Sequence, residues 1–122
     1  MDKAQAIQYF WSQFELMAYD ENAVPDDAQY PYITYQAVTD SLDYVVGMSA
    51  SLWYRSTKWE EISQKAEEIS EYITIGGKVI PLDYGYLWIF RGTPFAQRMI
   101  DENDPLVKRI YINISAEFLT DK

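Results

Sequence analysis

Near its carboxyl end the chain reads Arg109-Ile110-Tyr111-Ile112-Asn113-Ile114-Ser115-Ala116-Glu117-Phe118. Every second residue of this stretch is apolar, and most of the residues between them are polar. Because successive side chains of a β-strand point to opposite faces of the sheet, the alternation predicts a long strand with one buried face.

A second stretch, residues 44–54, has the same period of two and is the natural pairing partner. One of its faces is large and apolar: Tyr44, Val46, Met48, Ala50, Leu52 and Tyr54. The other face is mostly small, because Gly47, Ser49 and Ser51 lie on it, and such a face suits the close approach of a helix or a neighbouring subunit. Shorter strands are predicted over residues 32–38, 78–82 and 86–90. The last of these is apolar on both faces, so we expect it to be central in the sheet or covered by a partner.

Two segments have helical spacing. Apolar residues recur at three- and four-residue intervals from Ile7 to Ala18, which predicts a helix that ends near Tyr19. A second helix is predicted to run to Ile73, opened by a capping box of Thr57 and Glu60 and ended by a left-handed cap at residues 76–77.

The predicted element order is α-β-β-α-β-β-β. Residues 91–94 are expected to break a strand, and residues 95–100 fit no single pattern. Sequential strands joined by short turns imply antiparallel pairing, and the helices most simply pack on one face of the sheet. The sequence therefore predicts the α+β class, with an antiparallel β-sheet flanked by two α-helices. The 122 residues fit a single domain, 1–122, since domains most often have about 100–150 residues.

Composition excludes several kinds of chemistry. The chain has no Cys and no His, so it cannot form disulfides, zinc sites built on those ligands, or a Ser–His–Asp triad. Its net charge of −9 repels phosphate backbones and anionic membrane surfaces. No apolar run approaches the roughly 20 residues that a membrane span needs.

Polar clusters in the sequence have ordinary structural explanations. Asp101, Glu102 and Asp104 lack the glycine and the distal glutamate of a calcium loop, which favours a solvated turn. The glutamates of residues 60–71 lie on or near the face opposite the apolar stripe of the second helix, where a helix is normally charged. Gly76-Gly77-Lys78 lacks the full spacing of a phosphate loop. We therefore expect no catalytic residue, no metal ligand and no cofactor, and a protein that is not an enzyme.

Two groups of residues instead suggest an interface. Residues 91–99 combine arginine, methionine and phenylalanine directly after an apolar strand, and these types are enriched where proteins meet. A similar group lies at the end of the strand that precedes the second helix. The candidate interface residues are Trp53, Tyr54, Arg55, Arg91, Phe95, Gln97, Arg98 and Met99.

The chain resembles the small tail-terminator proteins of long-tailed, non-contractile phages and prophages of low-GC Gram-positive bacteria. The resemblance spans nearly the whole chain and is carried by short motifs: Tyr30-Pro31-Tyr32-Ile33-Thr34-Tyr35, Leu52-Trp53-Tyr54-Arg55-Ser56-Thr57-Lys58-Trp59, Ile75-Gly76-Gly77, Trp88-Ile89, Gly92-Thr93-Pro94-Phe95-Ala96-Gln97 and Ile110-Tyr111-Ile112-Asn113-Ile114.

The resemblance implies a virion protein that is assembled in the host cytoplasm and forms a homo-oligomeric ring, expected to be a hexamer. Such a ring caps the tail tube, stops its polymerisation and joins it to the head connector, while DNA passes through the lumen without specific binding. Its partners are then other copies of the chain, the tail tube protein and the head connector or adaptor. Acidic walls would suit such a channel, because they repel phosphate.

Two alternatives remain open from the sequence. One is a different role in phage morphogenesis, such as a head-completion adaptor or a tail chaperone. The other is a small-ligand-binding α+β domain, with a pocket lined by Tyr44, Met48, Trp88 and Tyr111.

Overall fold

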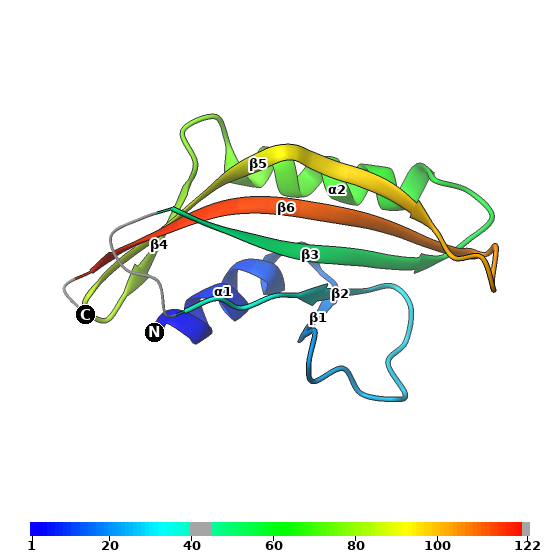
Figure 1. Cartoon of the computed structure of the whole chain (residues 1–122), viewed down its shortest axis with the longest axis horizontal. Coiled ribbons are helices and arrows are strands. Elements are labelled where there is room, and N and C mark those ends of the chain that lie inside the picture. The colour runs from blue at the N-terminus through cyan, green and yellow to red at the C-terminus, as the bar shows by residue number, and fades with distance from the viewer. Residues whose placement is uncertain (40–44, 121–122) are drawn as a thin grey trace.

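The structure is a computed structural model that describes residues 1–39 and 45–120. Its core is a six-stranded sheet in the order β1-β2-β3-β6-β5-β4, in which β1 and β2 are parallel and every other neighbouring pair is antiparallel (Figure 1). The elements are α1 (Lys3–Trp11), the 3-10 turn η1 (Ser12–Phe14), β1 (Met17–Asp20), β2 (Tyr32–Tyr35), β3 (Val46–Arg55), α2 (Glu60–Ile73), β4 (Lys78–Leu82), β5 (Gly85–Ile100) and β6 (Val107–Thr120).

The central pair, β3 and β6, follows the alternation of the sequence. Ala50 lies opposite Ile112 and Ser51 opposite Tyr111 in the antiparallel register. The even-numbered side chains from Met48 to Tyr54 and from Ile110 to Phe118 are buried, whereas the side chains between them, with the exception of Ser51, are at least partly exposed. The predicted pairing of these two stretches and their single buried face are confirmed.

Both helices contribute to the same core, which lies on one face of the sheet. The buried residues of α1 are Ala6, Ile7, Phe10 and Trp11, and those of α2 are Ile62, Ala66, Ile69 and Ile73. The two helices meet through an aromatic contact, with the Phe10 and Tyr72 ring centroids 5.9 Å apart. Because α1 contacts both edge strands, β1 and β4, it lies across the space between the two edges of the sheet.

The amino-terminal helix is shorter than predicted. It ends at Trp11 rather than near Tyr19, and Glu15 then takes a left-handed conformation (φ 62°) that no helix can continue through. The following residues form β1, which pairs with β2 from Met17 opposite Tyr32 onward. The observed order is therefore α-β-β-β-α-β-β-β, and the sheet is mixed rather than wholly antiparallel.

The boundaries of α2 and β2 also differ from the prediction. The helix begins at Glu60 with Trp59 as its N-cap and has no side-chain cap, so Thr57 does not form the predicted capping box. The helix ends at Ile73 as predicted, but Thr74, with φ 67°, is the residue that leaves the helix, ahead of the predicted glycine cap. Strand β2 stops at Tyr35, three residues before the predicted end at Val38.

Residues 91–94 do not end the strand. β5 continues from Gly85 to Ile100, and its register against β6 shifts from Arg91 opposite Ile114 to Ala96 opposite Ile112. The extra residues form a bulge, in which Asn113 Nδ2 donates to the carbonyl of Pro94 at 3.0 Å. A bulge of this kind bends a strand without interrupting its pairing.

None of the helices in the described residues is long and apolar enough to cross a membrane.

The backbone conformation of the turn between α2 and β4 can be tested by mutation. Gly77 has φ +86°, and a Cβ added there would lie 2.4 Å from Trp88 Nε1 and 2.8 Å from the carbonyl oxygen of Ile89. We expect Gly77→Ala to lower the free energy of unfolding by about 2–3 kcal/mol, because it adds backbone strain to a steric clash. The neighbouring Gly76 has no atom within 4 Å of such a Cβ, so Gly76→Ala is the matched control. Urea unfolding of both variants measures the difference, and equal stabilities would contradict this description of the turn.

Candidate interaction surface

The eight candidate interface residues do not form one patch. Trp53, Gln97 and Met99 share the uncovered face of the sheet with Arg109, which lies opposite both Trp53 and Met99 in the register. Arg91, Phe95 and Arg98 lie on the helix side, beside α2.

The two remaining candidates lie elsewhere. Arg55 ends β3 and pairs with Asp104 (Nε to Oδ2, 3.4 Å). Tyr54 lies in the core with only 6% of its surface exposed. It is therefore too buried to contact a partner, and its assignment to an interface is wrong for this structure.

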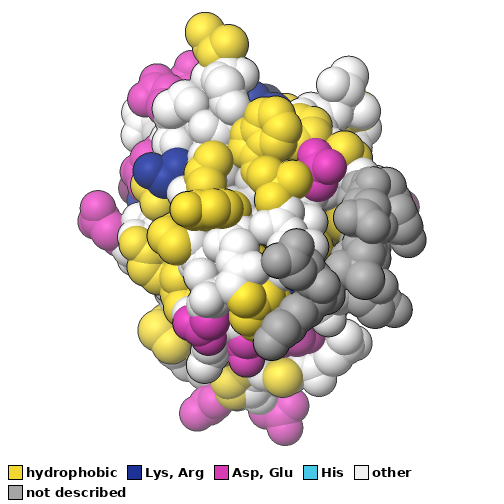
Figure 2. Space-filling view, turned by 90° about the vertical axis from the view of Figure 1, so that its left-hand side faces the viewer, with side chains coloured by type: hydrophobic (Ala, Val, Ile, Leu, Met, Phe, Trp, Pro, Cys, Tyr) yellow, Lys and Arg dark blue, Asp and Glu magenta, His cyan; other side chains and the backbone are white. Residues whose placement is uncertain are grey.

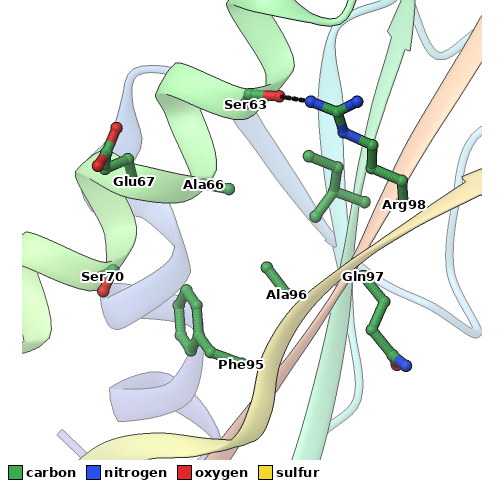
Figure 3. A pocket seen from close by; sticks show the side chains of 9 residues that line it. Ser63, Ala66, Glu67, Ser70, Phe95, Ala96, Gln97 and Arg98 are labelled. Atoms are coloured by element: carbon green, nitrogen blue, oxygen red, sulfur yellow. Dashed lines mark hydrogen bonds between the residues drawn. The ribbon is translucent and has the colours of Figure 1, made fainter.

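A groove of about 300 Å³ separates α2 from β5. Its walls are Ser63, Ala66, Glu67 and Ser70 of α2, residues 95–98 of β5, and Ile110 of β6. Figure 3 shows that Phe95 points toward α2 whereas Gln97 points away from the groove. Gln97 and the adjacent Arg98 thus lie on opposite faces, as the pleat of a strand requires, whereas Phe95 lies on the same side as Arg98 because the register shift before Ala96 interrupts the alternation.

Two arginines flank this groove. Arg98 Nη2 donates to Ser63 Oγ at 3.3 Å (Figure 3). Its guanidinium lies 5.0 Å from the centre of the Trp59 ring. Arg91 Nε donates to the carbonyl of Ser70 at 3.2 Å. Among the residues that the structure describes, neither arginine forms an ion pair. Two fixed positive charges therefore lie beside an open groove on a chain of net charge −9.

The outer edge of β5 is covered over only part of its length. β4 pairs with Gly85–Ile89, and no described strand pairs with the outer side of β5 beyond that point. The bulge and Pro94 shield the first part of this free edge, as is common where a sheet ends. The second part, residues 96–100, has no such shield and exposes Met99 (42%) and Ile100 (78%).

The face of the sheet opposite the helices has a second hollow, of about 260 Å³. Its floor is built from Ser49, Ala50 and Ser51, and its walls include Tyr32, Trp53 and Tyr111. Arg109 is held within it, because its Nε donates to Ser51 Oγ at 2.9 Å and its guanidinium lies 4.8 Å from the Trp53 ring and 5.6 Å from the Tyr111 ring.

This Arg109 cluster was missed in the sequence. The sequence contains one signal for this cluster, the alternation of apolar and polar residues in the two strands. It puts Arg109 and Tyr111 on the polar face of one strand and Ser51 and Trp53 on the polar face of its partner. The pocket predicted from the sequence does not assemble, because Met48 is buried on the helix side whereas Trp88 and Tyr111 lie on the other face. Tyr44, its fourth residue, lies outside the described residues.

A third surface lies at the end of the sheet near the β4–β5 hairpin. Val79 is opposite Trp88, and Tyr86 is opposite Leu119, so these four side chains share one face across three strands. Figure 2 looks onto this end of the molecule and shows apolar side chains gathered there among charged ones. The Trp88 indole is anchored by its Nε1, which donates to the carbonyl of Gly76 at 3.0 Å.

The acidic residues that the structure describes have local roles or face solvent. Asp101 Oδ1 accepts from the amide of Asn103 and Asp104 Oδ1 accepts from the amide of Leu106, so both carboxylates hold turns in the β5–β6 connection. The glutamates of α2 lie on its exposed side. Within residues 1–39 and 45–120, no three acidic side chains are arranged to hold a metal ion.

Comparisons with known proteins give no relative for this chain: no family model matches it, and no curated protein or solved structure is significantly similar to it. The function must therefore be argued from the surfaces described above.

The buried Tyr54 gives a prediction about stability at high pH. Burial, together with the nearby carboxylates of Glu61 and Glu68, raises the pKa of Tyr54 to about 12 from its ordinary value of 10.0. Because the unfolded chain then loses this proton more easily than the folded one, the contribution of Tyr54 to stability is intact below pH 10 and is lost as the pH rises toward 12.

We expect the unfolding free energy of Tyr54→Phe to fall less steeply over that interval than that of the wild type. Urea unfolding at pH 9, 10 and 11 measures the slopes. Glu61→Gln removes the second cause of the shift and should give an intermediate slope, whereas identical slopes in all three proteins would contradict the assignment.

Proposed function

We propose that this protein is a structural assembly protein that acts as a phage tail terminator: copies form a ring, of hexameric type, that caps the tail tube and joins it to the head connector. The proposal rests on the resemblance stated above and on surfaces that a lone protomer leaves open. It predicts self-association, contact with the tail tube protein and a location in the virion.

The observation that carries the proposal is the free edge of β5. Residues 96–100 present an edge with which no strand of the described residues pairs, together with exposed Met99 and Ile100. Such an edge is a template for pairing with another chain, and proteins that stay monomeric usually protect it. Most of the predicted interface residues in the β5 segment lie within or directly beside this edge, which favours its use as a subunit contact.

The charge of the chain supports the passage of DNA through such a ring. A net charge of −9 repels phosphate, and the exposed glutamates of α2 supply part of this charge. The proposal therefore places carboxylates along the lumen. A ring whose lumen is lined by lysine and arginine, with the carboxylates outside, would be inconsistent with it.

Other roles in phage morphogenesis would use the same surfaces. A head-completion adaptor would also be part of the particle, whereas a tail chaperone would be absent from it. Mass spectrometry of purified particles distinguishes these roles, because a terminator is present at a few copies. Deletion of the gene should give overlong tails without heads if the protein ends tube growth.

The edge gives a direct test. Burying an isoleucine side chain contributes about 1.5–3 kcal/mol, so Ile100→Lys should weaken self-association by at least about tenfold. Ile75→Lys is the control, because Ile75 is 99% exposed in the α2–β4 turn, where it lies beside Phe90 and Arg91 rather than beside residues 96–100. Sedimentation and electron microscopy, alone and with tail tube protein, measure the effect. Wild-type protein that stays strictly monomeric in both settings would overturn the proposal.

A second candidate function is suggested by the Arg109 hollow. The hollow has aromatic walls, one arginine and one acidic residue, Glu21. The Nε of Arg109 is fixed by Ser51 and its Nη atoms have no hydrogen-bond partner among the described residues, which suits a small planar or acyclic anion. In that case the chain would be a ligand-binding α+β domain, and the ligand would carry a carboxylate or a phosphate.

Thermal unfolding with a panel of small carboxylates and inorganic phosphate tests this alternative. Binding at tenfold over Kd should raise the Tm by about 4 °C. The shift should be absent in Arg109→Gln and retained in Arg55→Gln, the matched control, whose arginine already pairs with Asp104. A panel without any shift would remove this candidate.

A further inference from the structure

The connection between β1 and β2 is long and exposed. It runs through residues 21–31, and Figure 1 shows it extending away from the sheet at the lower edge of the molecule. Glu21 N donates to the carbonyl of Tyr35 in β2, and beyond Glu21 the backbone hydrogen bonds of the loop are local, from Ala23 N to the carbonyl of Asp20 and from Ala28 N to that of Pro25. The second of these bonds closes a turn whose members Pro25, Asp26 and Asp27 are all exposed.

The tip of this loop is strongly acidic. Asp26 and Asp27 are adjacent, and neither carboxylate forms an ion pair within the described part of the chain. Glu21 adds a third negative charge nearer to the sheet. The tip of the loop is thus an exposed anionic projection, whereas its base stays beside its own protomer, where Glu21 and Val24 line the Arg109 hollow.

The groove between α2 and β5 has the complementary character. Arg91 and Arg98 are held beside it by Ser70 and Ser63, with no carboxylate bound to either in the described residues. Its inner surface is apolar where Phe95, Ala66 and Ile110 line it, and Glu67 on the α2 side is the single acidic residue of the lining. A volume of about 300 Å³ accommodates the side chains of a turn rather than a whole strand.

The two surfaces lie on opposite sides of the protomer. The loop leaves the β1–β2 side of the sheet, whereas α2 and β5 lie beyond β3 and β6 on the other side (Figure 1). A contact between two different surfaces is heterologous, and when its rotation closes, such a contact generates a ring.

We propose that the groove between α2 and β5 binds the β1–β2 loop of a second copy of this chain, with Asp26 and Asp27 of one copy meeting Arg91 and Arg98 of the next. The inference rests on the proposed self-assembly and names its subunit contact. Salt should weaken this contact, because its charges lie near the surface and are screened by the solution. The Debye length is about 8 Å at physiological ionic strength.

Complementary knock-outs test the contact. Asp26→Asn/Asp27→Asn removes the charges of the loop, and Arg91→Gln/Arg98→Gln removes those of the groove. Each should raise the concentration at which the protein assembles by at least about tenfold. A control pair, Glu15→Gln/Glu102→Gln, removes two exposed carboxylates elsewhere and should assemble as the wild type does.

Mixing the two knock-outs gives the decisive readout. A loop-deficient copy still has an intact groove, and a groove-deficient copy still has an intact loop. The mixture should therefore form dimers and stop there, as measured by sedimentation. Higher oligomers in the mixture, or full assembly of either knock-out alone, would overturn the proposed contact while leaving self-assembly itself in place.

Disulfide trapping separates the contact from the function. The chain has no cysteine, so Gln29→Cys in the loop and Glu67→Cys in the groove introduce single thiols that leave both charge pairs in place. The mixed variants should cross-link under mild oxidation, and faster than either variant with itself. Cross-linking without rings would support the contact and overturn the proposed function, whereas rings without preferential cross-linking would overturn the contact alone.

Discussion

The structure depends on the antiparallel pairing of β3 with β6, because these strands carry the buried face on which both helices pack. Their register sets Leu52 opposite Ile110 and Ala50 opposite Ile112, so the apolar side chains of two long strands meet on one side. All large apolar contacts of α1 and α2 are made on that side. The same pairing collects Ser49, Ser51, Trp53, Arg109 and Tyr111 on the other side, where no helix covers them.

This one-sided arrangement explains why the protomer has open surfaces. Two helices of modest length cover a single face of a six-stranded sheet, and α1 is committed to the space between β1 and β4. Among the described residues, the outer part of β5 then has α2 on one side, β6 as its only strand neighbour, and a free edge. The open face, the free edge and the groove beside α2 have one cause: the described helices and strands are too few to cover both faces and the whole outer edge of the sheet.

The sequence predicts the parts of this fold in which one pattern dominates. The alternation in residues 109–118 and the helical stripe of α2 specify their elements without ambiguity. It fails at β1, because Phe14, Met17 and Ala18 fit helical spacing as well as they fit a strand, and only the left-handed Glu15 and the pairing with β2 decide between them. It fails at residues 91–94 because a glycine and a proline mark a bulge as readily as a turn.

Prediction of the candidate surface is limited by the same ambiguity. The alternation of residues 44–54 already placed Tyr54 on the apolar face with Leu52, so its burial could have been inferred from the sequence. Arg109 could not have been joined to Trp53 in this way, because their contact depends on the register between strands that are distant in the sequence. Phe95 and Gln97 could be assigned to opposite faces only once the register shift before Ala96 was known, because residues two apart in a regular strand share a face.

The two edges of the sheet differ in a way that bears on how copies could join. At β1 the outward carbonyl of Ala18 accepts from Gln8 Nε2 at 3.3 Å, and the strand has only four residues, so α1 partly closes this edge. At β5 the edge beyond Ile89 is open. A sheet with one closed and one open edge is a poor unit for endless strand-to-strand growth, because the open edge of one copy can pair only with the open edge of another, and that twofold contact ends at a dimer. A contact that builds a ring must therefore engage a different feature of the neighbour, and heterologous contacts of that kind are the ones from which closed rings are built.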